Sequence, residues 1–176
     1  MSEKIKTYKG KVKKKGNFPF SDFYKFLYDY LIDEGYNVYE TTYLEKRQGD
    51  SKELNITWQA YKQISNYFQF EIDSNWIILG MKSIEYADPD DATQKIKTDN
   101  GALEIGLSST LIKDPNNQWT KKFWKYLRKI YDKYVIRKRI DQYEEELIEE
   151  TNKYAAYMRS LLEMQGQHSI RRETLA

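Results

Sequence analysis

The sequence predicts an α+β fold with an N-terminal helix, an antiparallel β-meander of about five to six strands and a long C-terminal helix. Two observations predict it: apolar residues alternate with a period of two between residues 36 and 112, and they recur at helical spacing on either side of that region. The turns between the alternating segments are short, so consecutive strands are expected to pair antiparallel, with one packed and one solvated face.

Residues 1–17 contain seven lysines and one glutamate. A weak alternation runs through Ile5, Thr7, Tyr8, Gly10 and Val12. This pattern is compatible with a short edge strand, and edge strands often carry lysines that prevent pairing with foreign chains. A basic arm is the alternative interpretation of the same residues.

The first helix is predicted between residues 21 and 34. Ser21 is the expected N-cap, Asp22 favours the first turn, and Gly35 is expected at the position after the last turn. The residues at helical spacing that are expected to form its buried face are Phe23, Phe26, Leu27, Tyr30 and Leu31.

The strands are predicted from alternation. One side of the first strand is expected to hold Tyr36, Val38, Thr42 and Leu44, and a turn is expected at residues 47–50. Apolar residues then keep even positions at Leu54, Ile56, Trp58, Ala60, Phe68, Phe70, Ile72, Trp76 and Ile78. Because this run is longer than an ordinary strand, a bend or turn is expected between residues 62 and 66.

A tight hairpin is predicted at Asn100-Gly101, the residue pair favoured in two-residue type I′ turns. In that register Ile96 faces Ile105, Thr98 faces Leu103, and Lys97 opposes Glu104 on the solvated side. The acidic segment 87–92 is expected to be a polar loop, because it lacks the spacing of a calcium-binding loop. Residues 114–117 are expected to end the last strand.

Two apolar stripes lie on the predicted C-terminal helix, and they differ by about 100° in direction, the rotation of one residue. The first stripe consists of Trp119, Phe123, Tyr126, Leu127, Ile130 and Tyr134. The second consists of Ile136, Ile140, Tyr143, Leu147, Tyr154, Met158 and Leu161. One straight helix does not bury both stripes on one surface, so we expect either a kink near residue 135 or a continuous helix that serves two surfaces.

The predicted organisation therefore has four parts. Residues 1–17 form the basic arm or edge strand, 18–134 the α+β core, 135–164 a projecting amphipathic helix and 165–176 a flexible tail. In this interpretation the second stripe binds a partner, either another copy of the chain or a different protein. The alternative is that the helix folds back on its own domain.

Charge also changes along this helix. The basic residues Arg137, Lys138 and Arg139 are followed by the acidic residues Glu144, Glu145 and Glu146. Opposite charges placed in this way predict pairing between neighbouring copies. A solvated helix face is the simpler interpretation of such a run. Phosphate contacts are a further candidate role for Lys122, Lys125, Arg128, Lys129 and Lys133, with Trp124 and Tyr131 beside them for base stacking.

The sequence lacks the residues that several kinds of chemistry need. It contains no cysteine, one histidine at position 168, and neither of the common glycine-rich phosphate-binding motifs. Glu71 and Asp73 form a carboxylate pair on one strand face, but a solvated sheet face has the same pattern. We therefore expect no enzymatic activity, no cofactor, no metal and no small-molecule ligand.

The resulting hypothesis is a non-catalytic structural or adaptor subunit that associates through its C-terminal helix. A small virion component of the connector type fits the size of the chain and its tyrosine content. The alternative hypothesis is a nucleic-acid-binding module that uses the lysine-rich N-terminus and the basic face of residues 121–133. Without an apolar N-terminal run or a long apolar segment, the protein is expected inside the cell or the virion, neither secreted by a signal peptide nor spanning a membrane.

Overall fold

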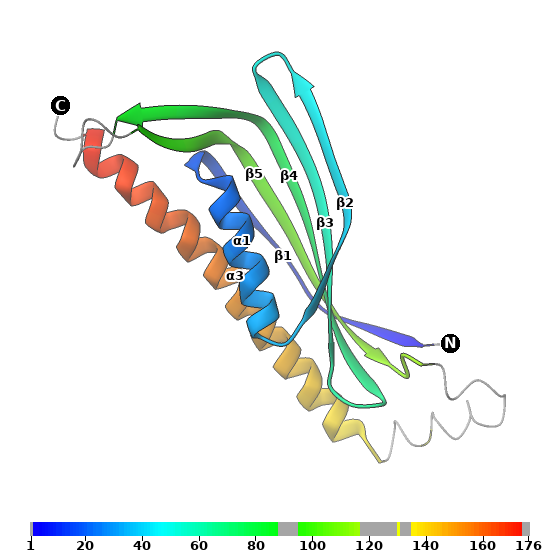
Figure 1. Cartoon of the computed structure of the whole chain (residues 1–176). Coiled ribbons are helices and arrows are strands. Elements are labelled where there is room, and N and C mark those ends of the chain that lie inside the picture. Colours follow the sequence, from blue (N-terminus) through cyan, green and yellow to red (C-terminus); the bar gives the residue numbers. More distant parts are fainter. Residues whose placement is uncertain (1, 88–94, 117–129, 131–134, 174–176) are drawn as a thin grey trace.

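The computed structural model describes residues 2–87, 95–116, 130 and 135–173. Its elements are β1 (Glu3–Phe18), α1 (Phe20–Asp33), β2 (Asn37–Gln48), β3 (Ser51–Gln63), β4 (Phe68–Ala87), β5 (Lys95–Lys113) and α3 (Arg137–Glu173). The five strands form one antiparallel sheet in the order β1-β5-β4-β3-β2. Both helices lie on the same side of the curved sheet, with α3 over β1 and β5 and α1 over β2 (Figure 1).

The described part of the chain confirms an α+β architecture with a C-terminal helix, and it differs from the expected order at the N-terminus. Of the two interpretations of residues 1–17, the structure has the strand: β1 precedes the first helix and pairs with β5 from Glu3–Lys113 to Phe18–Asp99. The first and last strands are therefore neighbours in the sheet, and β1 and β2 form its two edges.

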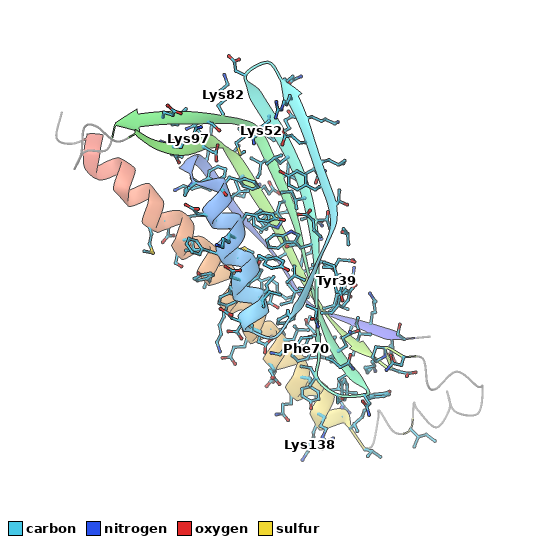
Figure 2. The ribbon with its side chains drawn as sticks, viewed as in Figure 1. Tyr39, Lys52, Phe70, Lys82, Lys97 and Lys138 are labelled. Carbon is cyan, nitrogen blue, oxygen red and sulfur yellow. The ribbon has the colours of Figure 1, made fainter. Side chains whose placement is uncertain are left out.

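The period of two is confirmed between residues 54 and 78. The even-numbered apolar side chains of β3 and β4 are buried on the side of the sheet that faces the helices. Trp58 and Trp76 pack with ring centroids 4.8 Å apart, and Phe23 of α1 packs edge-on against Trp76 at 5.7 Å. Phe70 lies among the side chains between the sheet and the helices (Figure 2). These aromatic contacts form the core.

The predicted hairpin at Asn100-Gly101 is wrong, because both residues lie inside one long strand, β5. Gly101 pairs with Gly16 of β1 and lies beside a bulge of β4, where Gly80 has a φ of +61°. A Cβ on Gly101 would lie 3.1 Å from the Leu79 carbonyl oxygen and from the Met81 Cα. Glycine therefore fits a close approach of two backbones that a Cβ would crowd, and the sequence signal does not distinguish this use of glycine from a turn.

A second bulge changes the pattern expected for β2. Glu40 pairs with Trp58 and Thr42 pairs with Thr57, so Thr41 has no partner residue. Because one extra residue reverses the alternation, Val38 faces the helices, whereas Leu44 faces outward and is 55% exposed. The expectation that Val38 and Leu44 share one side was wrong for this reason.

The first helix agrees with its prediction in position and in its C-terminal cap. Gly35 has a φ of +85° and its N–H donates to the Ile32 carbonyl, as expected after the last helical turn. The expected N-cap at Ser21 is wrong: the helix begins at Phe20 with Pro19 in the N-cap position, two residues earlier. Phe23, Leu27 and Leu31 are buried, while Phe26, which was expected on the buried face, is 47% exposed.

The expectation that the C-terminal helix projects from the domain is wrong. Ile136, Ile140, Leu147, Tyr154 and Met158 are buried within the chain, and Tyr143 and Leu161 are partly buried against the same core. A turn at residues 135–136 immediately precedes α3, which begins at Arg137. The helix is instead folded back on its own domain, which is the alternative interpretation of the sequence.

Aromatic residues account for this docking. Tyr143 packs against Phe68 of β4 with ring centroids 5.0 Å apart, and Tyr154 stacks on Tyr30 of α1 at 5.5 Å. The tyrosines of the stripe thus bury their rings against the sheet and the first helix. The first stripe lies outside the described residues, apart from Ile130.

Helix α3 continues to Glu173, beyond the predicted end at residue 164. No helix in the described part of the chain is long and apolar enough to cross a membrane.

Candidate functional site

A row of exposed lysines follows the outward face of β1, on the side of the sheet away from the helices. It consists of Lys4, Lys6, Lys9, Lys11, Lys13 and Lys15. Alternate residues of a strand point to the same face, and the row spans about 36 Å at ~3.3 Å per residue. Thr7 is bulged between Lys6 and Tyr8, which is why Lys6 and Lys9, three residues apart, share a face.

Two carboxylates form ion pairs with three of the six lysines in this row. Glu104 of β5 pairs with Lys11 at 2.6 Å and with Lys13 at 2.8 Å, and these hydrogen bonds lower the pKa of Glu104 to about 2. Lys4 pairs with Glu71 of β4 at 2.8 Å. Within the described residues, no carboxylate pairs with the remaining members, Lys6, Lys9 and Lys15. These three ammonium groups are the uncompensated charges of the lysine row.

A shallow hollow of about 290 Å³ lies at one end of the row. Its lining residues are Lys13, Lys14, Lys15, Ile77, Leu79, Ala102, Leu103 and Glu104. Ile77 and Leu79 are 43% and 50% exposed, so aliphatic side chains border the lysines on the outward face. A ligand at this position would meet both positive charge and apolar surface.

The carboxylate pair of β4 is less solvated than its sequence pattern indicated. Glu71 is only 3% exposed, and both of its oxygens accept hydrogen bonds from Lys4, at 2.8 and 3.2 Å. Asp73 has one oxygen buried without a hydrogen-bond partner, and burial together with the charge of Glu71 raises its pKa. Burial and a hydrogen bond to Glu71 raise the pKa of Tyr61 to about 12.

This pair is an anionic cluster held by one lysine. Within the described residues, no group of three or more His, Asp or Glu side chains is placed to hold a metal ion. Both oxygens of Glu71 accept hydrogen bonds from Lys4, and this contact fixes the position of Lys4 in the lysine row.

The sequence-predicted site residues are distributed over several places. The stripe of α3 is buried, as described above. Arg137, Lys138 and Arg139 are exposed at the start of α3, at the end of the molecule away from Lys52 and Lys82 (Figure 2). The candidate phosphate contacts Lys122, Lys125, Arg128, Lys129 and Lys133 lie outside the described residues, as do Trp124 and Tyr131.

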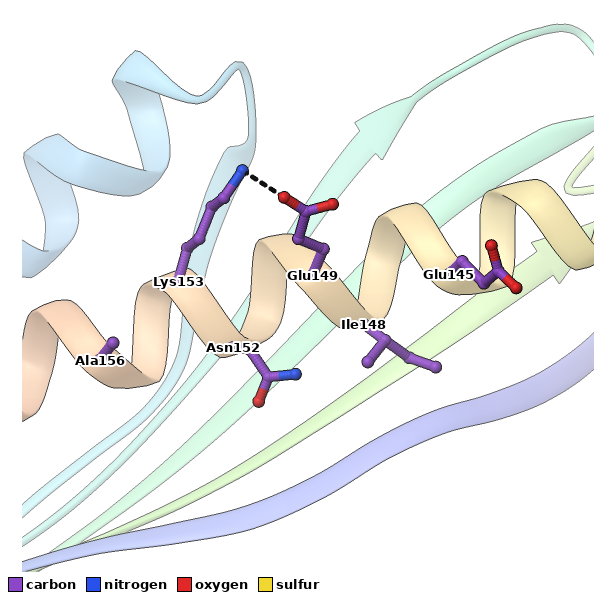
Figure 3. A pocket seen from close by; sticks show the side chains of 6 residues that line it. All are labelled: Glu145, Ile148, Glu149, Asn152, Lys153 and Ala156. Atoms are coloured by element: carbon purple, nitrogen blue, oxygen red, sulfur yellow. Dashed lines mark ion pairs between the residues drawn. The ribbon is translucent and has the colours of Figure 1, made fainter.

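The acidic block of α3 borders a depression on the exposed side of this helix. Glu145 and Glu146 are exposed, whereas Glu144 is partly buried, and burial raises its pKa. The depression of about 480 Å³ is lined by Glu145, Ile148, Glu149, Asn152, Lys153 and Ala156 (Figure 3). All six side chains belong to α3, and Lys153 pairs with Glu149 at 2.8 Å. This is an open helix face with a small apolar strip.

Comparisons of this chain with protein-family models, with curated proteins and with solved structures found no match. Functional inference therefore rests on the chemistry of the surfaces.

Sequence reasoning identified the lysine-rich N-terminus but did not resolve its two faces. The signal was present: lysines at positions 4, 6, 9, 11, 13 and 15 keep an interval of two with one interval of three. A single longer interval is what a bulge produces in an alternating strand. The pairing of the row with Glu71 and Glu104 depended on strand order, which the alternation of one strand does not contain.

Proposed function

We propose that the protein is a non-catalytic binding module that holds single-stranded nucleic acid along the lysine row of β1. The observation that carries this proposal is that Lys6, Lys9 and Lys15 are exposed on one strand face without a carboxylate partner in the described residues. Lysines contact phosphates as point charges. Sequence-independent binding of a single nucleic-acid strand requires a row of positive charges of this kind.

The geometry of the row supports an extended ligand. Lysines on alternate residues of a strand are about 6.6 Å apart, so an extended chain of anionic groups meets several ammonium groups at once. Ser108 of β5, which is partly exposed, lies beside Lys9 on the same face and supplies a neutral hydrogen-bonding group. Lysines on an edge strand also discourage pairing with foreign strands. The binding proposal differs from that role because it requires a salt-dependent ligand.

The proposal is tested by binding of a fluorescent oligodeoxythymidylate to the full chain. Changing Lys6, Lys9 and Lys15 to Gln removes the three uncompensated charges, and we expect at least a tenfold loss of affinity at low salt. The matched control changes Lys25, Lys138 and Arg159 to Gln. These three residues are also exposed, but they lie on the two helices. Their replacement removes the same net charge as the change in β1. Equal losses in both variants would show that only net charge matters, and the proposed track would be wrong.

Association between copies is a second candidate function. Arg137, Lys138 and Arg139 are exposed near the exposed Glu145 and Glu146, and Lys138 and Glu145 share a helix face because they are seven residues apart. Two α3 helices that pair antiparallel around residues 141–142 would place basic groups of one copy opposite acidic groups of the other. An adaptor or virion role would use such contacts, which involve the exposed side of α3 instead of the buried stripe.

Charge reversal in the full chain tests this second candidate, since α3 is part of the core and is not removed without loss of the fold. Changing Arg137, Lys138 and Arg139 to Glu should lower the solution mass of any oligomer. Changing Glu144, Glu145 and Glu146 to Lys as well, in the same molecule, should restore the mass of the oligomer. A monomer at high concentration before any change would exclude self-association and direct the search to a different protein.

A further inference from the structure

A small aromatic pocket lies at the other edge of the sheet, between the start of α1 and β2. Its volume is about 250 Å³, and it is lined by Phe20, Ser21, Tyr24, Glu40 and Tyr43. Three of the five lining residues are aromatic and one is a carboxylate, while none is basic. The pocket is smaller than those that hold drug-sized ligands, so its size fits a compact chemical group.

The bulge at Thr41 creates this arrangement. Glu40 and Tyr43 are three residues apart, and in a regular strand they would point to opposite faces. Because Thr41 is the extra residue, both side chains face the helices. Its hydroxyl donates to the Thr57 carbonyl at 3.2 Å, which ties the bulge to β3. Bulges commonly re-aim side chains beside binding sites, and this one brings an acid and a phenol into one pocket.

The aromatic walls are held from behind by the core. Tyr24 packs edge-on against Trp58 with ring centroids 4.7 Å apart, and lies 5.8 Å from Trp76. Phe20 is 5.7 Å from Tyr24 at an interplanar angle of 54°, so the two rings form two sides of a corner. Tyr43 supplies the third ring and is 47% exposed, which places it at the mouth. The site is thus organised without a ligand.

The carboxylate of Glu40 has a fixed position in this pocket. Its Oε2 accepts hydrogen bonds from the Tyr24 hydroxyl and, at 3.5 Å, from the Trp58 Nε1. Burial and Glu40 raise the pKa of Tyr24 to about 12, so this phenol stays protonated and keeps donating to Glu40 near neutral pH. Burial, Glu45 and Glu40 raise the pKa of Tyr43. The carboxylates that act on these two tyrosines are therefore Glu40 and Glu45.

We propose that this pocket binds a methylated ammonium group, with the rings of Phe20, Tyr24 and Tyr43 around the cation and Glu40 beside it. Aromatic faces attract cations, and cages of such rings recognise quaternary ammonium groups. A primary ammonium ion is strongly hydrated and would lose those hydrogen bonds against ring faces, whereas methyl groups pack against them. An anion is disfavoured by Glu40. The proposal is independent of the lysine row on β1, and it adds a small-molecule ligand that the sequence did not predict.

Choline is the probe that tests the chemistry, and its uncharged isostere 3,3-dimethylbutan-1-ol is the matched ligand control. Binding is followed by NMR through the Trp58 indole N–H, which lies directly behind Tyr24 and Glu40. We expect saturable shifts with choline at millimolar concentration and at least tenfold weaker binding of the isostere. Equal binding of the two, or no saturation with choline below roughly 50 mM, would overturn the proposal.

Variants locate the site. Tyr43→Leu removes the ring at the mouth and Glu40→Gln removes the charge, and each should weaken choline binding about tenfold. Tyr39→Leu is the matched control, because Tyr39 is an exposed tyrosine on the opposite face of the same strand. If Tyr39→Leu weakens binding as much as Tyr43→Leu does, the cation binds elsewhere. A thermal melt of each variant confirms that the fold is intact before binding is compared.

Methylated ammonium groups occur on modified protein side chains and on lipid headgroups, and two further binding experiments distinguish these sources. Nα-acetyl-trimethyllysine amide represents a modified protein side chain, and phosphatidylcholine vesicles represent a lipid headgroup. Tighter binding of the first than of free choline would assign the pocket to a methylated protein, with unmethylated lysine amide as the weaker control. Co-sedimentation with vesicles that Glu40→Gln abolishes would assign it to the headgroup. Failure of both arms together with choline would reject the methylated-ammonium site and leave the lysine-row proposal untouched.

Discussion

The two edge strands of the sheet carry opposite chemistry. β1 presents lysines on the outward face, and α3 covers its inner side; β2 presents an acid and a tyrosine on the inner face, beside α1. A bulged threonine produces both arrangements: Thr7 brings Lys6 and Lys9 to one face, and Thr41 does so for Glu40 and Tyr43.

Each bulged threonine is tied to the neighbouring strand. The Thr7 hydroxyl lies 2.8 Å from the Ser109 hydroxyl, and the Thr41 hydroxyl donates to the Thr57 carbonyl. One extra residue per strand therefore decides which side chains gather at each edge, while the pairing of the rest of the strand is kept. The surface chemistry of this sheet is therefore set by which face each strand position takes as much as by composition.

The largest effect is expected where α3 covers the β1 half of the sheet. Leu147 is fully buried, so Leu147→Ala should lower the free energy of unfolding by about 2–5 kcal/mol, because it removes packing and leaves a cavity. Ile148 is the adjacent, partly exposed residue, and Ile148→Ala should cost about 1 kcal/mol or less. Chemical denaturation measures both. Similar costs for the two variants would mean that the stripe is not the buried face.

The close approach beside the β4 bulge is expected to have the next largest effect. Gly101→Ala should destabilise the protein by about 1–3 kcal/mol, because the new Cβ meets the Leu79 and Met81 backbone, which cannot move as a flexible side chain does. Gly106→Ala is the control in the same strand, since its Cβ would lie 3.9 Å from its nearest neighbour. Denaturant midpoints compare them, and a neutral Gly101→Ala would show that the backbone of β4 does not restrict the side chain at this position.

The sequence was sufficient for the features that depend on local pattern. The even positions from Leu54 to Ile78, the cap at Gly35 and the end of the last strand at Lys113 all follow from periodicity or from residues with special backbone preferences. The same signal failed at Gly101, because a glycine needed for a turn and a glycine needed for close approach look alike in a sequence.

Two other features required tertiary information. The bulge at Thr41 has no residue type that marks it, so the alternation of β2 was assigned to the wrong face after Glu40. The burial of Leu147 and Tyr154 depends on contacts with the sheet and with α1, which the periodicity of one helix does not contain. The lysine row was predictable in part. Its spacing is visible in the sequence, but its ion pair with Glu104 follows only from the pairing of β1 with β5.

The two edges are expected to lose stability at opposite ends of the pH scale. Glu104 has its pKa lowered to about 2 by Lys11 and Lys13, so its contribution is present above pH ~4.5 and is lost as the pH falls through 2. Tyr24 has its pKa raised to about 12, so its contribution is present below pH ~10 and is lost as the pH rises through 12. Both effects are small, because both groups are partly exposed and solvent screens their interactions.

Denaturation midpoints measured across the pH range separate the two edges. Glu104→Gln should flatten the acid side of the stability profile and leave the alkaline side unchanged, and Tyr24→Phe should do the reverse. If either variant changed stability equally on the acid and alkaline sides of the profile, the two edges would not contribute to stability independently. Tyr36, whose hydroxyl donates to Glu150 and whose pKa is raised by burial, also contributes on the alkaline side, so Tyr24→Phe is compared in a Tyr36→Phe background.

The salt dependence of oligodeoxythymidylate binding measures how many phosphates the lysine row of β1 contacts. Three phosphate contacts by Lys6, Lys9 and Lys15 predict that log K falls with log salt with a slope of about −2, because each contact releases about 0.7 counterion from a single strand. The Lys-to-Gln variant at these three positions should bring the slope close to zero, while the helix-side control keeps it near −2. An unchanged slope in the β1 variant would contradict the account.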